Sequence, residues 1–251
     1  MSKKFIYLLL LPFFFIQCEK DSAVSLQTSF GNNGAGGSLA RFAIAGNYLY
    51  TVDDQKLNVF DISTPGNPVL KNTQNVGFSI ETIFPLNDNL FIGSATQVYI
   101  YSIADPANPK KLSDAISPQA LRRCDPVVAK DSVAYATLRT NGPCGGSQSV
   151  LSVFNIKDFL NPVQVTTVPV AEPYGLGYKN NILYVCDRQN GLLLFDITDP
   201  YNPLPINVSI NDGIYLDVIP YQNSLICWVT TGIILYDITD PGNPALIKII
   251  N

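Results

Sequence analysis

The sequence contains no histidine among its 251 residues. This absence excludes histidine general bases, Ser-His-Asp triads and histidine-ligated metals in one step. Charged residues are scarce, at 14% of the chain, and the formal net charge is −4. An acidic chain without a basic stripe is not expected to bind nucleic acid. We also expect neither a cofactor nor a metal site.

The chain has no apolar run long enough to span a bilayer near its N-terminus. Residues 5–16 are apolar, but 12 residues are too few, and they follow the basic pair Lys3 and Lys4. The run ends in Phe-Ile-Gln-Cys at Cys18, which resembles a bacterial lipobox, although Gln17 replaces the usual small residue. We interpret residues 1–18 as a lipoprotein signal peptide and Cys18 as the lipidated residue. An ordinary secretory signal is the alternative.

Lipidation at Cys18 would hold the protein at a membrane, because the two or three acyl chains of a lipoprotein anchor stably. We therefore expect an outer-membrane lipoprotein. The next residues, Glu19-Lys20-Asp21, resemble an export tag that sends some lipoproteins to the cell surface. Residues 19–38 are small and polar and end in a glycine-rich stretch, which is typical of a flexible tether.

One segment recurs along the rest of the chain. It reads DITDPYNP at Asp196–Pro203, and related segments end at Pro68, Pro109, Pro162, Pro203 and Pro244. The residue numbers give spacings of 41, 53, 41 and 41. A period of about 40 residues is the signature of a repeat architecture.

The recurring segment, called the anchor below, has the chemistry of a turn. Asp199 suits the first position of a type I turn, and Pro200 fixes φ at the second. A calcium site built from Asp196 and Asp199 is the functional alternative, but turn chemistry already accounts for both residues.

Four short strands are expected in each repeat, at 175–179, 182–186, 192–196 and 204–210 in the fourth. The third strand of most repeats is apolar on both alternating faces, so it must be covered on both sides. Stacking of sheets around an axis does this. We therefore predict an all-β fold, a β-propeller of five four-stranded blades over residues 39–251. An open solenoid would need polar outer faces on its end blades, and residues 246–250 show none.

The segment Ile182–Pro203 resembles the LVIVD repeat family, which is named for the motif of its third strand. The first, second and fifth repeats also match, whereas the third departs at Asn155 and at Phe159-Leu160. The resemblance covers about 210 residues. It implies a propeller on bacterial cell-surface lipoproteins, and it implies no catalytic residues.

Two cysteine pairs are of interest. Cys124 and Cys144 are expected on loops of one propeller face, next to a 12-residue insertion in the third repeat, and an exported protein permits a disulfide between them. Two free thiols are the alternative. Cys186 and Cys227 are 41 residues apart. We expect them to be buried thiols, with a disulfide as the alternative if a missing residue turns Cys227 toward the facing blade.

The face opposite the anchors carries the variable loops, and loops usually carry binding. Candidate ligand-binding residues there are basic or aromatic: Arg122, Arg123, Arg139, Tyr174, Arg188 and Tyr215. They suit an anionic or sugar ligand, and solvated charge with packing aromatics is the alternative. We expect a non-catalytic binding or scaffold module for a protein or glycan. The alternative is a carboxylate hydrolase using Glu81, Asp125, Glu172 and Asp187, which would need paired carboxylates at the axis.

Overall fold

The computed structural model describes residues 37–64, 66–116, 124–139 and 148–251, with the side chains of 124–125 and 207–209 excepted. The signal peptide and residues 19–36 of the tether lie outside the described residues. The described residues fall in one compact unit and form twenty strands in five four-stranded sheets. No helix occurs among them. The predicted fold class, an all-β propeller of five four-stranded blades, is confirmed.

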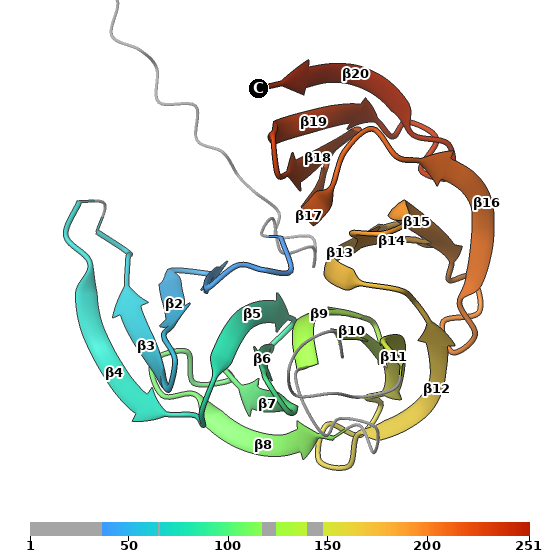
Figure 1. Ribbon diagram of the computed structural model, residues 1–251. Coiled ribbons are helices and arrows are strands. Elements are labelled where there is room, and N and C mark those ends of the chain that lie inside the picture. Colours follow the sequence, from blue (N-terminus) through green and yellow to red (C-terminus); the bar gives the residue numbers. More distant parts are fainter. Residues whose placement is uncertain (1–36, 65, 117–123, 140–147) are drawn as a thin grey trace, which may run out of the picture. The chain divides into compact units, whose positions relative to one another are not determined.

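The blades follow the chain order (Figure 1). Blade 1 holds β1 (Phe42–Ala45), β2 (Tyr48–Val52), β3 (Lys56–Asp61) and β4 (Val69–Asn75). Blade 2 holds β5 (Ile80–Leu86), β6 (Asn89–Ser94), β7 (Val98–Ser102) and β8 (Lys110–Ala115). Blade 3 holds β9 (Cys124–Lys130), β10 (Val133–Leu138), β11 (Val150–Asn155) and β12 (Val163–Pro169). Blade 4 holds β13 (Pro173–Lys179), β14 (Ile182–Asp187), β15 (Gly191–Asp196) and β16 (Leu204–Ile210). Blade 5 holds β17 (Tyr215–Tyr221), β18 (Ser224–Val229), β19 (Gly232–Asp237) and β20 (Ala245–Ile250).

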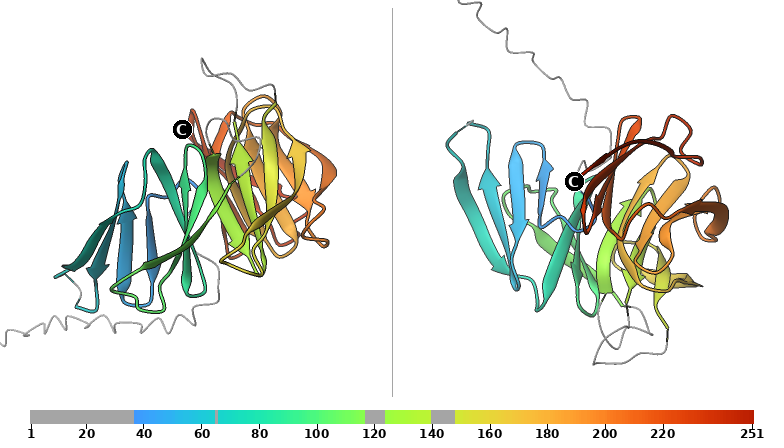
Figure 2. Two further views of the ribbon diagram at one scale, coloured as in Figure 1. Left: turned by 90° about the horizontal axis from the view of Figure 1, so that it is seen from below. Right: turned by 45° about the horizontal axis from the view of Figure 1, so that its top comes forward.

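Each blade is an antiparallel meander in which every strand pairs with the next along the chain. Figure 2 shows the sheets from two further directions as twisted layers. The turn between β13 and β14 uses Asn180 at a φ of 54°, and the turn before β15 uses Gly191 at 83°. A Cβ at Gly191 would lie 2.2 Å from the Ile210 carbonyl oxygen. This turn therefore requires glycine.

The anchors form the expected turns. The Asn202 N–H donates to the Asp199 carbonyl oxygen at 3.1 Å, and the Tyr201 N–H donates to the Asp199 carboxylate at 3.1 Å. The Asp196 carboxylate accepts the Thr198 N–H at 2.8 Å. Both aspartates of the anchor are thus occupied by their own turn, as the sequence predicted.

The anchors also join neighbouring blades. At three anchors, a tyrosine hydroxyl from the preceding blade donates to the carbonyl of the anchor's first proline. The three such bonds join Tyr50 to Pro106 at 2.9 Å, Tyr135 to Pro200 at 2.9 Å and Tyr184 to Pro241 at 2.8 Å. Between blades 2 and 3 an aromatic pair replaces the bond: Phe91 stands for the tyrosine, Phe159 for the proline, and their rings lie 6.3 Å apart. The departure of the third anchor therefore matches a change in the blade before it.

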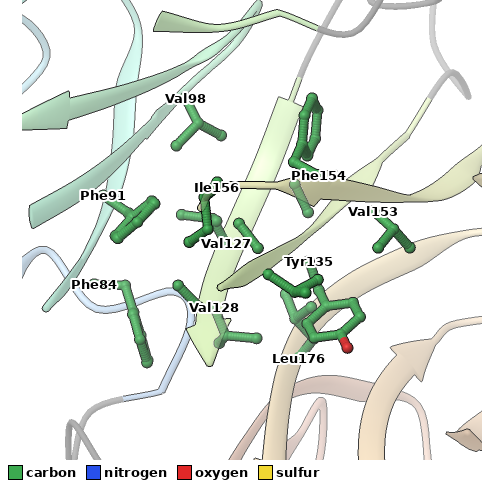
Figure 3. Close-up of a cluster of buried hydrophobic side chains, with 14 of the residues drawn as sticks. Phe84, Phe91, Val98, Val127, Val128, Tyr135, Val153, Phe154, Ile156 and Leu176 are labelled. Atoms are coloured by element: carbon green, nitrogen blue, oxygen red, sulfur yellow. The ribbon is translucent and has the colours of Figure 1, made fainter. Parts of the chain in front are cut away.

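The core lies between successive sheets. Figure 3 shows side chains of three blades meeting, among them Phe91 of blade 2, Val127 and Tyr135 of blade 3 and Leu176 of blade 4. A second apolar cluster lies between blades 1 and 2, and a third between blades 4 and 5. The third contains Cys186 and Cys227, both free and fully buried. The expected buried thiols are confirmed, and Cys227 does face blade 4.

Candidate functional site

The structure brings three of the predicted ligand-binding residues together at the junction of blades 3 and 4. Arg139 follows β10, Tyr174 lies in β13, and Arg188 follows β14. The guanidinium carbon of Arg139 lies 3.9 Å from the centroid of the Tyr174 ring, and that of Arg188 lies 5.3 Å from it. Two cations therefore share one aromatic ring, an arrangement that the ring quadrupole stabilises.

Arg188 has two polar partners in this cluster. Its Nη1 donates to the Tyr174 hydroxyl at 2.9 Å and lies 3.5 Å from Oε1 of Glu172. The Tyr174 hydrogen bond raises the pKa of Arg188 above its usual value, and electrostatic interactions with Tyr174 and then with Glu172 raise it further. The guanidinium is therefore cationic at every physiological pH, and more than a third of the Arg188 side chain remains exposed to solvent.

Asp187 organises the loops that carry these side chains. One carboxylate oxygen accepts the N–H groups of Ala171 and Glu172 at 2.8 and 2.9 Å. The other accepts those of Gln189 and Asn190 at 3.0 and 2.9 Å. The side chain is fully buried. Asp187 thus ties the loop entering blade 4 to the turn after β14, and so it positions Glu172 and Arg188.

Tyr174 is fixed from blade 3 as well. The buried Thr137 hydroxyl donates to the Tyr174 carbonyl oxygen at 3.0 Å, across the junction between β10 and β13. Thr137 could not be identified from the sequence, because threonine in a buried strand carries no signal for a contact with another blade. The roles of Thr137 and Asp187 are structural: they hold the aromatic ring and the two arginines in register.

The remaining predicted site residues are not in this cluster. Tyr215 is fully buried, its hydroxyl lies 2.5 Å from that of Tyr236, and burial raises the pKa of Tyr215 to about 12. This corrects the expectation that Tyr215 is available to a ligand on the loop face: its strand turns the ring into the core between blades 4 and 5. Arg122, Arg123 and Cys144 lie outside the described residues, as does the side chain of Cys124. The disulfide therefore stays a prediction.

Two of the four carboxylates considered for hydrolysis have partners here. Asp187 accepts four backbone N–H groups, and Glu172 is paired with Arg188. Glu81 is half-buried in β5, and the Asp125 side chain is not described. Within the described part of the chain, no three residues of the types His, Cys, Asp or Glu are grouped so as to hold a metal ion.

A second buried carboxylate, Asp217 in β17, lies where the chain enters the propeller. Its Oδ1 accepts the Ser38 hydroxyl hydrogen at 3.1 Å, and its Oδ2 accepts the Leu39 N–H at 3.4 Å. Ser38 in turn accepts the Leu176 N–H of blade 4 at 2.6 Å, and the Ala40 carbonyl accepts the Ile83 N–H of blade 2 at 2.9 Å. Burial raises the pKa of Asp217 to about 6. Residues 37–40, the plug segment, thus bond to three blades.

The sequence gives no indication of the plug segment, because a serine in a glycine-rich stretch is typical of a flexible tether. The packing against it is close. A Cβ at Gly37 or at Gly175 would lie 2.1 or 2.2 Å from an Asp217 carboxylate oxygen. Both positions therefore require glycine for contact rather than for backbone freedom.

The fold and repeats define the class of protein: a β-propeller built from five blades. The family model described as LVIVD repeat matches residues 36–76 and 178–206, so the chain contains LVIVD repeats in blades 1 and 4. This confirms the resemblance recognised in the sequence for these two repeats. A search of curated proteins found no match.

Solved structures show the fold alone, since their sequence identities are low. A functionally unknown protein from Desulfotomaculum acetoxidans has a TM-score of 0.65 and 11% identity, over 86% of this chain and 68% of that one. The periplasmic gluconolactonase of Pseudomonas aeruginosa has a TM-score of 0.63 and 14% identity, over 81% and 67%. The computationally designed Ika8 protein has 0.58 and 15%, and this chain spans only 59% of its length.

Proposed function

We propose that this protein is a non-catalytic binding module of the cell surface, held to the outer membrane through lipid on Cys18. Its ligand is an anionic group of a glycan or of an acidic protein segment, bound at Arg139, Tyr174 and Arg188. The observation that supports this proposal is the pair of guanidinium groups on one tyrosine ring, positioned by the buried Asp187.

The chemistry of the cluster suits recognition of an anion. A guanidinium presents N–H donors in a planar fork that matches the two oxygens of a carboxylate or the oxygens of a sulfate. Tyr174 keeps both arginines close together and limits the side-chain freedom lost when a ligand binds. Glu172 neutralises part of the charge, so an incoming anion competes with Glu172 for Arg188.

Binding is favoured over catalysis because the carboxylates near this cluster already have partners. Asp187 supports two loops, and Glu172 holds Arg188. The gluconolactonase named above is similar in fold only and contributes no catalytic residue to this chain.

The ligand proposal is tested by applying the purified full chain to an array of neutral, carboxylated and sulfated glycans. We expect binding to acidic glycans that falls at least tenfold in R188A. The control is K157A: Lys157 also lies over a tyrosine ring, with its Nζ 6.0 Å from the Tyr201 centroid, but it belongs to an anchor. Equal loss in both variants, or release of product from the bound glycan, would contradict the proposal.

The membrane location is tested separately by C18A. Because the acyl chains would be attached to this thiol, we expect the variant to leave the membrane fraction of lysed cells. Membrane association that is unchanged in C18A would refute lipid anchoring and leave the ligand proposal intact. Among the residues that the structure describes, no helix is long and apolar enough to cross a membrane.

A further inference from the structure

Blades 1 and 5 each have an apolar sheet face that no other strand among the described residues covers. In blades 2 to 5, the residue four positions before the positive-φ residue of the turn between the first two strands faces the preceding blade. In blades 2 to 5 these residues are at most 1% exposed: Ile83, Val127, Leu176 and Val218. The equivalent residue of blade 1, Phe42, is 56% exposed. Blade 1 therefore carries an interior-type residue on a face that no other described strand covers.

Other residues extend this face of blade 1, which we call the leading face. Ile44 and Leu49 lie opposite each other on β1 and β2, Leu49 is paired with Phe60 on β3, and Phe60 with Leu70 on β4. Phe42, Ile44 and Leu70 are about half exposed or more. One apolar row of the leading face thus crosses all four strands, and the next row continues from Phe42 through the polar residues Thr51, Asn58 and Thr73.

Blade 5 has the complementary surface, the trailing face. The position that faces the following blade holds Tyr50, Phe91, Tyr135 and Tyr184 in blades 1 to 4, all fully buried, and holds Ile226 in blade 5. Ile226 is paired with Leu235, Trp228 with Ile233, and Ile233 with Ile250. Trp228 is 52% exposed.

The residue at position 226 suits the trailing face to packing without a partner from an anchor turn. A tyrosine at position 226 would need a carbonyl partner from the next blade, as Tyr50, Tyr135 and Tyr184 have. Isoleucine has no hydroxyl, so its burial leaves no polar group unsatisfied. Monomeric proteins rarely expose contiguous apolar surfaces of this kind unless they bind something.

The two faces do not cover each other within the chain. Strand packing among the described residues runs from blade 1 to 2, 2 to 3, 3 to 4 and 4 to 5, and includes no extensive contact between β1–β4 and β17–β20. The plug segment, which precedes β1, is bonded to β5, β13 and β17. The bonds to Asp217 lie on β17, the first strand of blade 5, and a Cβ at Gly37 or at Gly175 would overlap the Asp217 carboxylate.

We propose that the trailing face of one copy of this chain binds the leading face of a second copy. A second copy is the partner that continues an interface already present in the molecule: four times along the chain, a trailing face packs on a leading face. The contact is head-to-tail, so it links copies into a closed ring or a chain of copies. This inference is independent of the proposed ligand site, which lies between blades 3 and 4.

Site-specific crosslinking tests the contact directly. Two differently tagged full-length chains are produced together, one carrying F42C and the other I226C, and are oxidised with a mild oxidant. We expect a covalent product that contains both tags and disappears on reduction. The tagged pair without substitutions controls for the native cysteines. A matched control pair carries V163C and L204C, at exposed apolar residues of the outer strands β12 and β16, and should give no mixed product.

Association in solution gives the second measurement. Sedimentation of the full-length chain over a hundredfold range of concentration should show oligomers, and F42E should shift it to the monomer. V163E is the control for charge on an equally exposed residue, since Val163 is 57% exposed, and it should leave the association unchanged. Circular dichroism of both variants verifies that the sheets are retained.

Two outcomes would overturn the proposal. A single chain carrying both F42C and I226C that crosslinks only within itself would mean that the faces close one ring. A chain that stays monomeric at every concentration would also overturn the proposal, and F42C that does not react with a soluble thiol reagent would then mean that another segment of the same chain covers the leading face.

Discussion

The two ends of the blades use aspartate in opposite ways. At the anchor end, Asp61, Asp196 and Asp237 are solvent-exposed or half-buried, and each accepts the N–H two residues later. At the other end, Asp187 is fully buried and joins two separate loops. The anchor aspartates therefore shape a turn that recurs, whereas Asp187 supports an arrangement found once. The end of the blades with the recurring anchor turns thus has a structural role, whereas the end with the single Asp187 arrangement carries the candidate site.

The largest expected effect comes from removing the buried aspartate. D187A leaves four backbone N–H groups without their acceptor, and each buried unsatisfied donor costs roughly 1–3 kcal/mol before relaxation. We expect a loss of at least about 3 kcal/mol in the free energy of unfolding, measured by urea denaturation, together with loss of glycan binding.

The matched variant at the anchor end is D196A. Its carboxylate serves its own exposed turn, so we expect a much smaller loss of stability than in D187A and unchanged binding. Equal losses in D187A and D196A would remove the distinction between the two ends of the blades.

The next effect concerns pH and separates Asp217 from the anchor aspartates. Burial raises the pKa of Asp217 to about 6, above the ordinary value of 3.8 that applies in the unfolded chain. The folded state therefore binds the proton more tightly, and stability is lost as pH rises from about 4 through 6. Hydrogen bonds from Thr198 and from Thr239 lower the pKa of Asp196 and of Asp237, respectively. The stability that these two carboxylates contribute to the folded state is therefore lost as the pH falls, in the opposite direction to that of Asp217.

We expect the wild type to lose roughly 2–3 kcal/mol between pH 4 and 7 through Asp217, as a shift of about two pKa units implies. The variant D217N should lack this component. Denaturant unfolding at several pH values measures it. A wild-type stability that increases with pH across this range, with no difference from D217N, would contradict the assignment.

Much of this fold could be predicted from the sequence because the repeat encodes local chemistry. The strands expected at 182–186 and 204–210 occur at Ile182–Asp187 and Leu204–Ile210. The anchor turn follows from Asp199 and Pro200 alone. These features depend on residues within a few positions of one another, where turn preferences and strand patterns act.

The candidate site could be predicted only in part. Loop position correctly placed Arg139, Tyr174 and Arg188 on one end of the blades, but the same reasoning placed Tyr215 there. Its burial depends on the register shift between Tyr215 and Asp217 in the pairing of β17 with β18. Contacts between distant segments, such as Ser38 with Asp217, have no local signature at all.

A smaller effect tests the bonds between anchors and blades. Y184F removes the hydroxyl that donates to the Pro241 carbonyl and keeps the buried ring, so we expect a loss of roughly 0.5–1.5 kcal/mol. Y221F, at an exposed tyrosine, is the control and should change stability by less than about 0.5 kcal/mol. If Y184F were as stable as Y221F, the recurring tyrosine would contribute packing alone.

The smallest effect is expected at the proline of the anchor itself. Pro200 contributes a fixed φ to the turn, and its carbonyl accepts the Tyr135 hydroxyl hydrogen. P200G removes the ring but keeps that carbonyl, so the bond to blade 3 remains. The variant should lose only about 0.4–1 kcal/mol, because the main consequence is a more disordered unfolded chain. Urea denaturation of P200G beside Y135F separates the two roles. A loss above about 3 kcal/mol in P200G would mean that the ring itself holds blades 3 and 4 together.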